Sequence, residues 1–164
     1  MKRLATFLLG LTRAPVRRLA RAYGLRLDPC HVPQGQYPLV FADDDATVRH
    51  HVPQSVHFNT RSGAIRVGRD TLFGEDVKVL TGMHMGLAQS RTESVPLHHV
   101  PESGRDIVIG EGCYIGSSAI LIGPLTIGDY AMIGAGAVVT RDVPAHGFAA
   151  GVPAKLVKLP DPGA

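Results

Sequence analysis

The stretch "IGEGCYIGSSAILIGPLTIGDYAMIGAGAVV", residues 109–139, repeats a branched aliphatic residue at every sixth position. These residues are Ile109, Ile115, Leu121, Ile127, Ile133 and Val139. A glycine follows directly at four of the six positions, and the fifth place of each unit holds a second, mostly small apolar residue: Cys113, Ala119, Leu125, Ala131, Ala137 and Val143. A period of six fits neither the helical period of 3.6 nor strict strand alternation, and it indicates a parallel β-helix of hexapeptide repeats.

We interpret the glycines as turn residues between very short strands, because such turns need positive φ angles and leave no space for a Cβ. Three hexads make one triangular coil of the helix. The expected coils are residues 67–84, 109–126 and 127–144, with a less regular coil around Val56, Phe58 and Ile65. Stacking these coils buries a continuous aliphatic column, in which each large side chain contributes roughly 1.5–3 kcal/mol. The sequence therefore predicts an all-β solenoid.

The same register runs upstream of the quoted stretch. Val79 lies 30 residues, or five whole units, before Ile109. Between them, residues 85–108 lose the aliphatic period and contain prolines and polar residues. We expect this segment to be a long loop excursion that leaves one coil and returns to the helix. Loops of this length usually carry function.

The composition favours a single domain with short appendages. The chain has 164 residues, of which 45% are hydrophobic, and this is enough apolar material for one core. We assign residues 48–159 to the β-helix domain and residues 160–164 to a tail. Two cysteines, Cys30 and Cys113, are too few for a disulfide framework, so we expect free thiols in a reducing, cytoplasmic compartment. No stretch predicts a transmembrane span or a secretory signal.

A basic segment precedes the predicted domain. Residues 1–27 contain seven Lys and Arg residues and no acid, whereas the rest of the chain has a net charge of −4. Apolar residues recur at helical spacing within it, which predicts a short amphipathic helical segment. We expect this segment to cap the open end of the solenoid. The alternative is peripheral contact of residues 1–26 with an anionic membrane surface.

Four stretches of the chain resemble the left-handed β-helix hexapeptide acyltransferases, particularly the maltose and galactoside O-acetyltransferases and the sugar acetyltransferases of polysaccharide biosynthesis. These stretches are "FNTRSGAIRVG" (58–68), "VLTGMH" (79–84), "GRDIVIGEGCYIGS" (104–117) and "IGDYAMIGAGAVVTRDVPAHGFAAGVPAKLVK" (127–158). The specific signals are a histidine that closes a coil before a loop and the closing motif "AGVPAK". The resemblance implies a left-handed β-helix, a homotrimer with active sites between neighbouring subunits, and acetyl coenzyme A as acyl donor without a metal.

The resemblance also implies which residues act on the acceptor. His84 matches the general base, which takes a proton from the acceptor hydroxyl or amine as that atom attacks the thioester. Imidazole suits this role because its ordinary pKa, about 6.5, leaves it largely neutral at physiological pH. Asn59 matches an asparagine that orients the acceptor. His98 and His99 in the excursion are candidates for contact with the acceptor.

A second group of residues matches the coenzyme site of the family. Ser117, Ala135, Thr140 and Arg141 match residues that meet the pantetheine arm and the phosphates, and Lys155 and Lys158 match a cationic pair near the nucleotide. Similar proteins have arginines where this chain has the two lysines. Because a lysine supplies a point charge without the two-pronged geometry of a guanidinium, this contact is expected to differ from that of the family.

The acceptor is left open by the sequence. The acceptor-binding domain that precedes the helix in the maltose and galactoside enzymes is replaced here by the basic segment, and the excursion is longer. We expect transfer of an acetyl group to a hydroxyl or amine of a sugar or sugar-containing acceptor.

Two alternatives to this function remain. One is a non-catalytic trimeric scaffold. The other is a metalloenzyme like the γ-class carbonic anhydrases, which hold zinc with histidines inside the hexads, whereas residues 109–144 contain no histidine. Nucleic-acid binding is not expected, because the basic segment offers neither a stacking platform nor a recognition motif.

Overall fold

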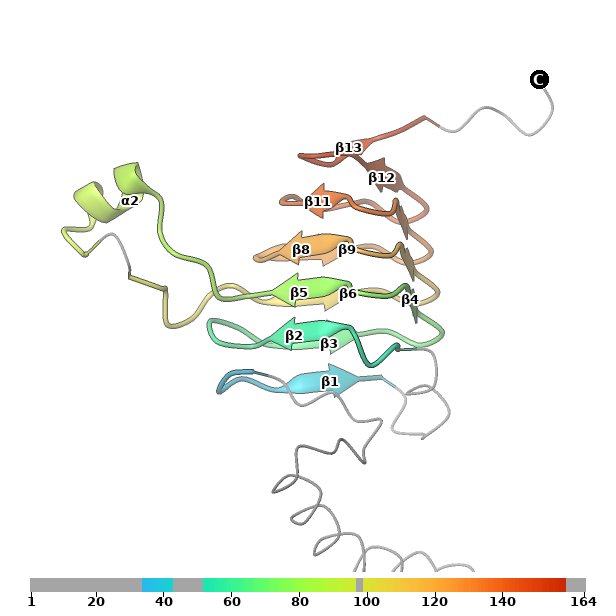
Figure 1. Cartoon of the computed structure of the whole chain (residues 1–164), viewed down its shortest axis with the longest axis horizontal. Coiled ribbons are helices and arrows are strands. Elements are labelled where there is room, and N and C mark those ends of the chain that lie inside the picture. Colours follow the sequence, from blue (N-terminus) through green and yellow to red (C-terminus); the bar gives the residue numbers. More distant parts are fainter. Residues whose placement is uncertain (1–33, 43–51, 97–98, 159–164) are drawn as a thin grey trace, which may run out of the picture. The chain divides into compact units, whose positions relative to one another are not determined.

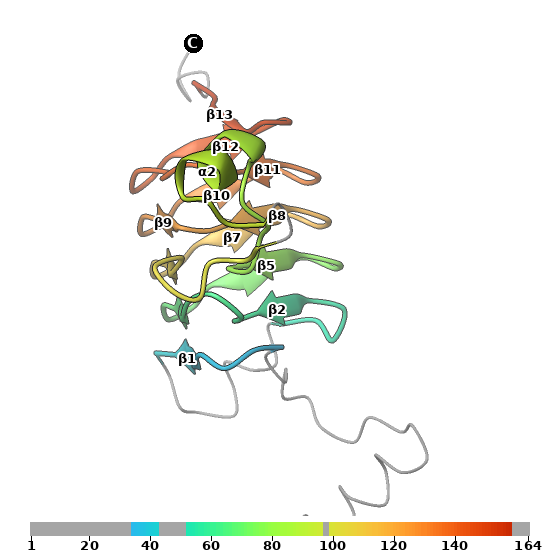
Figure 2. The same ribbon diagram turned by 90° about the vertical axis from the view of Figure 1, so that its left-hand side faces the viewer.

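The structure, a computed structural model, describes residues 34–42, 52–96 and 99–158. The basic segment 1–27, His98 and the tail 160–164 lie outside the described residues. Within the described ranges the chain winds through three sheets of short strands that enclose one core (Figure 1, Figure 2). The predicted solenoid of hexapeptide repeats is therefore confirmed. No helix in these ranges has the length and apolar character needed to cross a bilayer.

The strands fall into three sheets, and all neighbours are parallel except the last pair, β12 and β13. The first sheet contains β1 (Leu39–Phe41), β3 (Ile65–Val67), β6 (Ile107–Ile109) and β9 (Leu125–Ile127). The second sheet contains β2 (His57–Asn59), β5 (Lys78–Leu80), β8 (Ile120–Ile122) and β11 (Val138–Val139). The third sheet contains β4 (Leu72–Phe73), β7 (Tyr114–Ile115), β10 (Met132–Ile133), β12 (Phe148–Ala150) and β13 (Lys155–Leu156).

The pairing register confirms that three hexads make one coil. Tyr114 pairs with Met132, so each residue faces the one 18 positions further along the chain. Across the excursion the step is 42 positions, as in the pairing of Lys78 with Ile120. The excursion therefore adds 24 residues, which is four whole hexads, and the coils on both sides of it keep a common register.

The aliphatic residues predicted at six-residue spacing form the core. The six members of the column in residues 109–139 are at most 1% exposed, and the second apolar residue of each unit is at most 4% exposed. At the other end of the core, the rings of Phe41, Phe58 and Phe73 pack edge to face, with centroids 6.0 and 5.8 Å apart. Burial of this single column holds the three sheets against one another.

The structure confirms one of the two reasons predicted for the hexad glycines, the lack of space for a Cβ, and shows that the other, a positive φ, is wrong. None of those in residues 109–139 that follow an aliphatic residue of the column has a positive φ. A Cβ at Gly116 would lie 2.6 Å from the backbone nitrogen of Ala135 and 2.7 Å from the carbonyl oxygen of Ile133, both in the next coil. Positive φ angles occur two residues after the hexad glycine: Asp70, Asp76, Gly112, Ser118, Tyr130 and Gly136. The hexad glycines therefore permit the close approach of coils, and the turn conformation falls on a later residue.

The helix begins earlier than the sequence indicates. β1 pairs in parallel with β3, so that Leu39 faces Ile65. Leu39 and Phe41 also pack against the core. This strand precedes residue 48, the predicted start of the domain. The step from Leu39 to Ile65 is 26 positions, which is not a whole number of hexads, so the six-residue period does not reveal β1.

The excursion leaves the second sheet after β5 and returns at β6 in the first sheet (Figure 1, Figure 2). It contains a short helix, α2 (Leu87–Thr92), which the sequence analysis did not predict. Its two limbs are joined by a hydrogen bond from the backbone nitrogen of Met85 to the carbonyl oxygen of His99, at 3.0 Å. The hydroxyl of Tyr37 donates to the carbonyl oxygen of Glu102 at 2.8 Å, which ties the far limb to the segment before β1.

Arg105 closes the base of the excursion. Its Nε donates to the carbonyl oxygen of Thr81 at 2.7 Å, and a terminal guanidinium nitrogen donates to the carbonyl oxygen of Gly123 in the next coil. Its backbone nitrogen donates to the carbonyl oxygen of Ser62 at 3.1 Å. Burial lowers the pKa of the Arg105 guanidinium from its ordinary 12.5, and the group stays charged at neutral pH. One side chain therefore joins the return of the excursion to its exit and to the following coil.

We expect Gly116→Ala to destabilise the β-helix, because the added Cβ meets backbone atoms of the next coil. The expected loss in free energy of unfolding is about 1–3 kcal/mol, the range for overpacked sites, and chemical denaturation measures it. Gly86→Ala is the matched control, because its φ is −66° and no atom lies within 4 Å of the added Cβ. Equal unfolding midpoints for the two variants would contradict the close approach of coils.

Arg105→Met should loosen the excursion, because the apolar side chain cannot donate to Thr81 and Gly123. We expect faster proteolytic cleavage within residues 85–104 and a loss of about 1–3 kcal/mol in the free energy of unfolding. The control is Arg66→Met, which removes an exposed ion pair with Asp106, at 3.6 Å, that contributes little. If both variants were cleaved at the rate of the unaltered protein, Arg105 would not hold the base of the excursion.

Candidate functional site

At the edge where the chain leaves the second sheet, two predicted site residues, Asn59 and Thr140, lie on one line. Asn59 pairs with Leu80 and Leu80 pairs with Ile122. The register of β8 and β11 places Thr140 next to Ile122 in the same line. Neighbouring strands lie about 4.8 Å apart, so the three steps from Asn59 to Thr140 span roughly 14 Å. The excursion leaves the helix from this line, directly after Leu80 and Thr81, and we call this place the exit corner.

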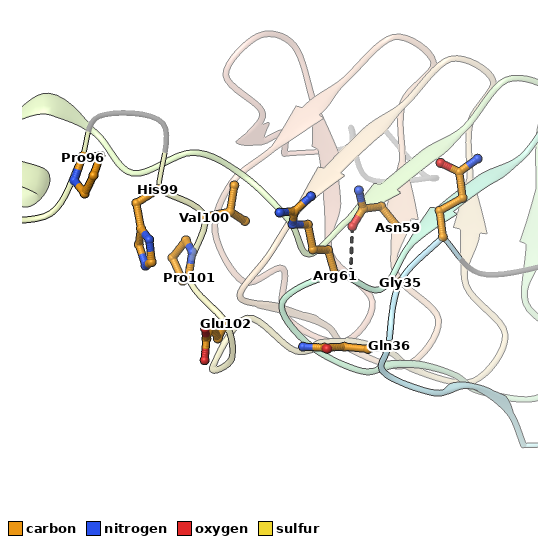
Figure 3. A pocket seen from close by; sticks show the side chains of 10 residues that line it. Gly35, Gln36, Asn59, Arg61, Pro96, His99, Val100, Pro101 and Glu102 are labelled. Carbon is orange, nitrogen blue, oxygen red and sulfur yellow. Dashed lines mark hydrogen bonds between the residues drawn. The ribbon is translucent and has the colours of Figure 1, made fainter.

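The Asn59 side chain is held in one orientation at the exit corner. Its Oδ1 accepts hydrogen bonds from the backbone nitrogens of Arg61, at 3.0 Å, and Gly82, at 3.3 Å (Figure 3 draws the first). Its backbone oxygen accepts from the nitrogen and the hydroxyl of Thr81, at 3.0 and 2.9 Å. Because both N–H groups bond the amide oxygen, Nδ2 faces away from the turn, and it has no hydrogen-bond partner among the described residues.

A cavity of about 990 Å³ opens beside the exit corner (Figure 3). Three segments line it: residues ahead of β1, the turn after β2, and the far limb of the excursion. Its polar side chains are Gln34, Gln36, Asn59, Arg61, His99 and Glu102. The cavity therefore brings together two of the residues predicted to contact the acceptor, Asn59 and His99.

His84 lies in the near limb of the excursion, two residues after Gly82, and its side chain is exposed. It is not among the residues that line the cavity. The hydrogen bond from Met85 to His99 nevertheless sets the backbone beside His84 against a residue that does line it. His98, the remaining predicted acceptor residue, lies outside the described residues. The role of His84 as general base stays a prediction.

Four of the six residues predicted to bind the coenzyme lie at two edges of the second sheet. Ser117 and Ala135 are exposed and stack one coil apart at the turn that leads into this sheet, where the backbone nitrogen of Gly136 donates to the carbonyl oxygen of Ser117 at 2.8 Å. Thr140 and Arg141 are exposed at the opposite edge, in line with the exit corner. A single chain therefore does not bring these four side chains to one place.

The two predicted lysines lie beyond the last hexad. Lys155 belongs to β13 and Lys158 follows it, and both side chains are exposed. The backbone nitrogen of Ala154 donates to the carbonyl oxygen of Val138 at 2.8 Å, which lays the turn before β13 against β11. Both cations thus follow directly after the coil that carries Thr140.

Sequence reasoning missed several residues of the cavity and its support. Arg61 directly follows the "FNT" of a stretch that carries the family resemblance, so its position was available, but its approach to the cavity was not. Gln34 and Gln36 precede the predicted domain, where no period marks them. Arg105 and Glu102 lie in the excursion, and only the long-range contacts of the fold assign them a place.

Comparisons with known proteins agree with the repeat pattern. The family model described as "Bacterial transferase hexapeptide (six repeats)" matches residues 106–141. The galactoside O-acetyltransferase of Escherichia coli is 36% identical over 92 residues, which cover 51% of this chain and 45% of that protein. The serine acetyltransferase of Escherichia coli is 37% identical over 102 residues, which cover 60% of this chain and 37% of that protein. The chain spans less than half the length of either relative.

Among solved structures, a hexapeptide-repeat acetyltransferase from Vibrio cholerae has the same fold, with a TM-score of 0.52, 19% identity and 89% of each chain covered. The same Vibrio cholerae protein has also been solved in complex with acetyl coenzyme A. The six-residue column, the coils of three hexads and the sequence relatives agree with one another. Residues 106–141 match the hexapeptide repeat of the bacterial transferases, and over about half of its length the chain is similar in sequence to hexapeptide-repeat acetyltransferases.

Proposed function

We propose that the protein transfers the acetyl group of acetyl coenzyme A directly to a hydroxyl or amine of a sugar or sugar-containing acceptor. The observation that carries this proposal is the cavity at the exit corner, which is lined by Asn59 and His99 and lies beside the limb that bears His84. The sequence relatives that match this part of the chain act on a galactoside and on serine. Small-molecule sites measure roughly 300–1,000 Å³, so a cavity of about 990 Å³ favours a saccharide over an amino acid.

In the proposed reaction His84 accepts the proton of the acceptor while the acceptor oxygen or nitrogen attacks the thioester carbonyl carbon. A C–O or C–N bond forms, the C–S bond breaks, and the imidazolium returns the proton to the departing thiolate. Asn59 supports this step because its fixed Nδ2 can donate to an oxygen of the acceptor. Such direct transfer needs no nucleophile from the protein.

The residues present fit the acyl donor. Arg141, Lys155 and Lys158 are exposed cations of the kind that bind phosphates. Ala135 is small, and no atom lies within 4 Å of a Cβ placed on Gly136, so this turn leaves an open shelf for a thin pantetheine chain. These features support a donor that lies along the outside of the last coils.

We further propose a homotrimer. In one chain, Ser117 and Ala135 lie at the opposite edge of the second sheet from Thr140 and Arg141. Neighbouring subunits that each supply one of these pairs would place all four side chains around one donor.

The compartment and the two alternative functions also need direct tests. Cys113 is a free, buried thiol, which supports a reducing compartment such as the cytoplasm.

The described part of the chain contains no group of three His, Cys, Asp or Glu residues arranged to hold a metal ion. A metalloenzyme would contain near-stoichiometric metal when purified, and a scaffold would release no coenzyme A with any acceptor.

His84→Ala should lower turnover by roughly 10² to 10⁴-fold, because the acceptor loses its general base. Release of coenzyme A from acetyl coenzyme A, measured over a panel of sugars, amino sugars and serine, checks this effect. Binding of coenzyme A and the oligomeric state should stay unchanged. His146→Ala is the matched control, since His146 stacks on Tyr130 with centroids 5.4 Å apart, away from the excursion. Full activity of His84→Ala would remove this residue from the mechanism.

Lys155→Ala should raise the KM for acetyl coenzyme A and leave the KM for the acceptor nearly unchanged, because the lost charge faces the donor's phosphates. Initial rates with each substrate varied in turn separate the two constants. Lys155→Arg is the control, because it keeps the charge and adds a two-pronged donor. The opposite pattern, a change in the acceptor KM alone, would show that the coenzyme path is misplaced.

A further inference from the structure

Arg61 presents its guanidinium to the cavity at the exit corner. Its side chain is exposed and lines the cavity. Only its backbone nitrogen is engaged, with Oδ1 of Asn59, and its guanidinium has no ion-pair partner among the described residues. We propose that Arg61 binds an anionic group of the acceptor, a carboxylate or a phosphate carried by a saccharide. This inference rests on the proposed acetyltransferase function and specifies its acceptor.

The backbone of Gly82 sets the path of the Arg61 side chain. A Cβ on Gly82 would lie 3.0 Å from Cβ and 3.5 Å from Cδ of Arg61, and 2.9 Å from Oδ1 of Asn59. The aliphatic stem of Arg61 therefore lies across a residue that has no side chain to displace it. Gly82 precedes His84 by two residues, so the cation lies close to the start of the limb that carries the proposed base.

The other polar groups around Arg61 favour an anion that also accepts hydrogen bonds. Figure 3 shows the guanidinium between Asn59 and Val100, whereas the carboxylate of Glu102 points away from it. The free Nδ2 of Asn59 adds a neutral donor on the same side. A guanidinium binds a carboxylate or a phosphate with two parallel hydrogen bonds, which gives orientation as well as affinity.

The cavity walls are fixed by hydrogen bonds rather than formed by loose side chains. The backbone nitrogen of Gln34 donates to the oxygen of Phe58 at 2.9 Å, and the nitrogen of Thr60 donates to the oxygen of Gln34 at 3.2 Å. The hydroxyl of Tyr37 holds the far limb through the carbonyl oxygen of Glu102. A wall held in this way loses little entropy when a ligand binds.

The size of the cavity indicates that the anionic group belongs to a larger molecule. A volume of about 990 Å³ far exceeds what a carboxylate or a phosphate group occupies alone. We therefore assign the remaining space to the sugar. A sugar acid and a sugar phosphate share the required chemistry, and the experiment below distinguishes them.

Isothermal titration of the full-length protein with glucuronate, glucose 1-phosphate and neutral glucose tests the inference. We expect at least one charged sugar to bind more tightly than glucose. Arg61→Gln should weaken that binding by roughly 10- to 100-fold and leave glucose unaffected, because a charge-assisted pair is lost. Arg61→Lys should retain part of the preference, since the charge remains without the fork. Arg69→Gln is the matched control, because it removes an exposed arginine after β3, at another turn of the coil.

The outcomes separate the two anions and the two proposals. Preference for glucuronate alone identifies a carboxylate, and preference for glucose 1-phosphate alone identifies a phosphate. The inference is overturned if neither charged sugar binds more tightly than glucose, or if Arg69→Gln removes the preference as fully as Arg61→Gln. Coenzyme A release with the same sugars is measured in parallel. Binding that depends on Arg61 without acetyl transfer would contradict only the proposed function. Acetylation of neutral sugars at a rate that Arg61→Gln does not change would contradict only this inference.

Discussion

The spacing of successive coils, set by hydrogen bonds between parallel strands at about 4.8 Å, is the constraint on which the rest of the structure depends. At this spacing a Cβ on Gly116 would overlap the backbone of the next coil, and the interior admits one large and one smaller apolar residue per hexad. Since the coils cannot slide, a residue's place in the 18-residue coil decides which edge of the triangular β-helix it occupies. Strands of two or three residues can therefore hold Asn59 and Thr140 on one line.

The apolar column, the length of one coil and the excursion were predictable from the sequence. The column and the coil follow from the six-residue period, and the excursion is the segment where this period is interrupted. The six-residue period did not predict strand β1 or helix α2, and each was missed for a different reason. β1 lies 26 residues before its partner in β3, so its place follows from packing against Phe58 rather than from spacing. Helix α2 has six residues, too few for a helical period to emerge from sequence. The positive φ angles were expected at the hexad glycines, but the chain places them two residues later, in part on Asp70, Asp76 and Ser118.

Some residues of the candidate site were likewise predictable from the sequence, and others were not. Asn59 and His99 were predicted and share one cavity, because Asn59 ends β2 and His99 lies in a long excursion that leaves the β-helix beside that end. Arg61 was overlooked because an arginine in a turn is ordinarily a solvated residue. Its direction is set by the missing side chain of Gly82 and by the return of the excursion, which Arg105 anchors. Neither cause is visible until residues more than 20 positions apart are brought together.

The excursion adds side chains to one corner of the β-helix without changing how the coils stack. Because it inserts four whole hexads, β8 still lies over β5 and the line from Leu80 to Thr140 stays straight. That line covers two strand steps, or roughly 10 Å, between the exit of the excursion and the proposed phosphate-binding residues. In the proposed reaction the donor must cross this distance with a narrow, flexible arm to bring its thioester to His84, and a pantetheine chain has that form. The separation of the acceptor cavity from the exposed cations of the last coil is therefore what a long acyl donor requires, whereas a compact donor held at Arg141 would leave its acyl group too far from the base.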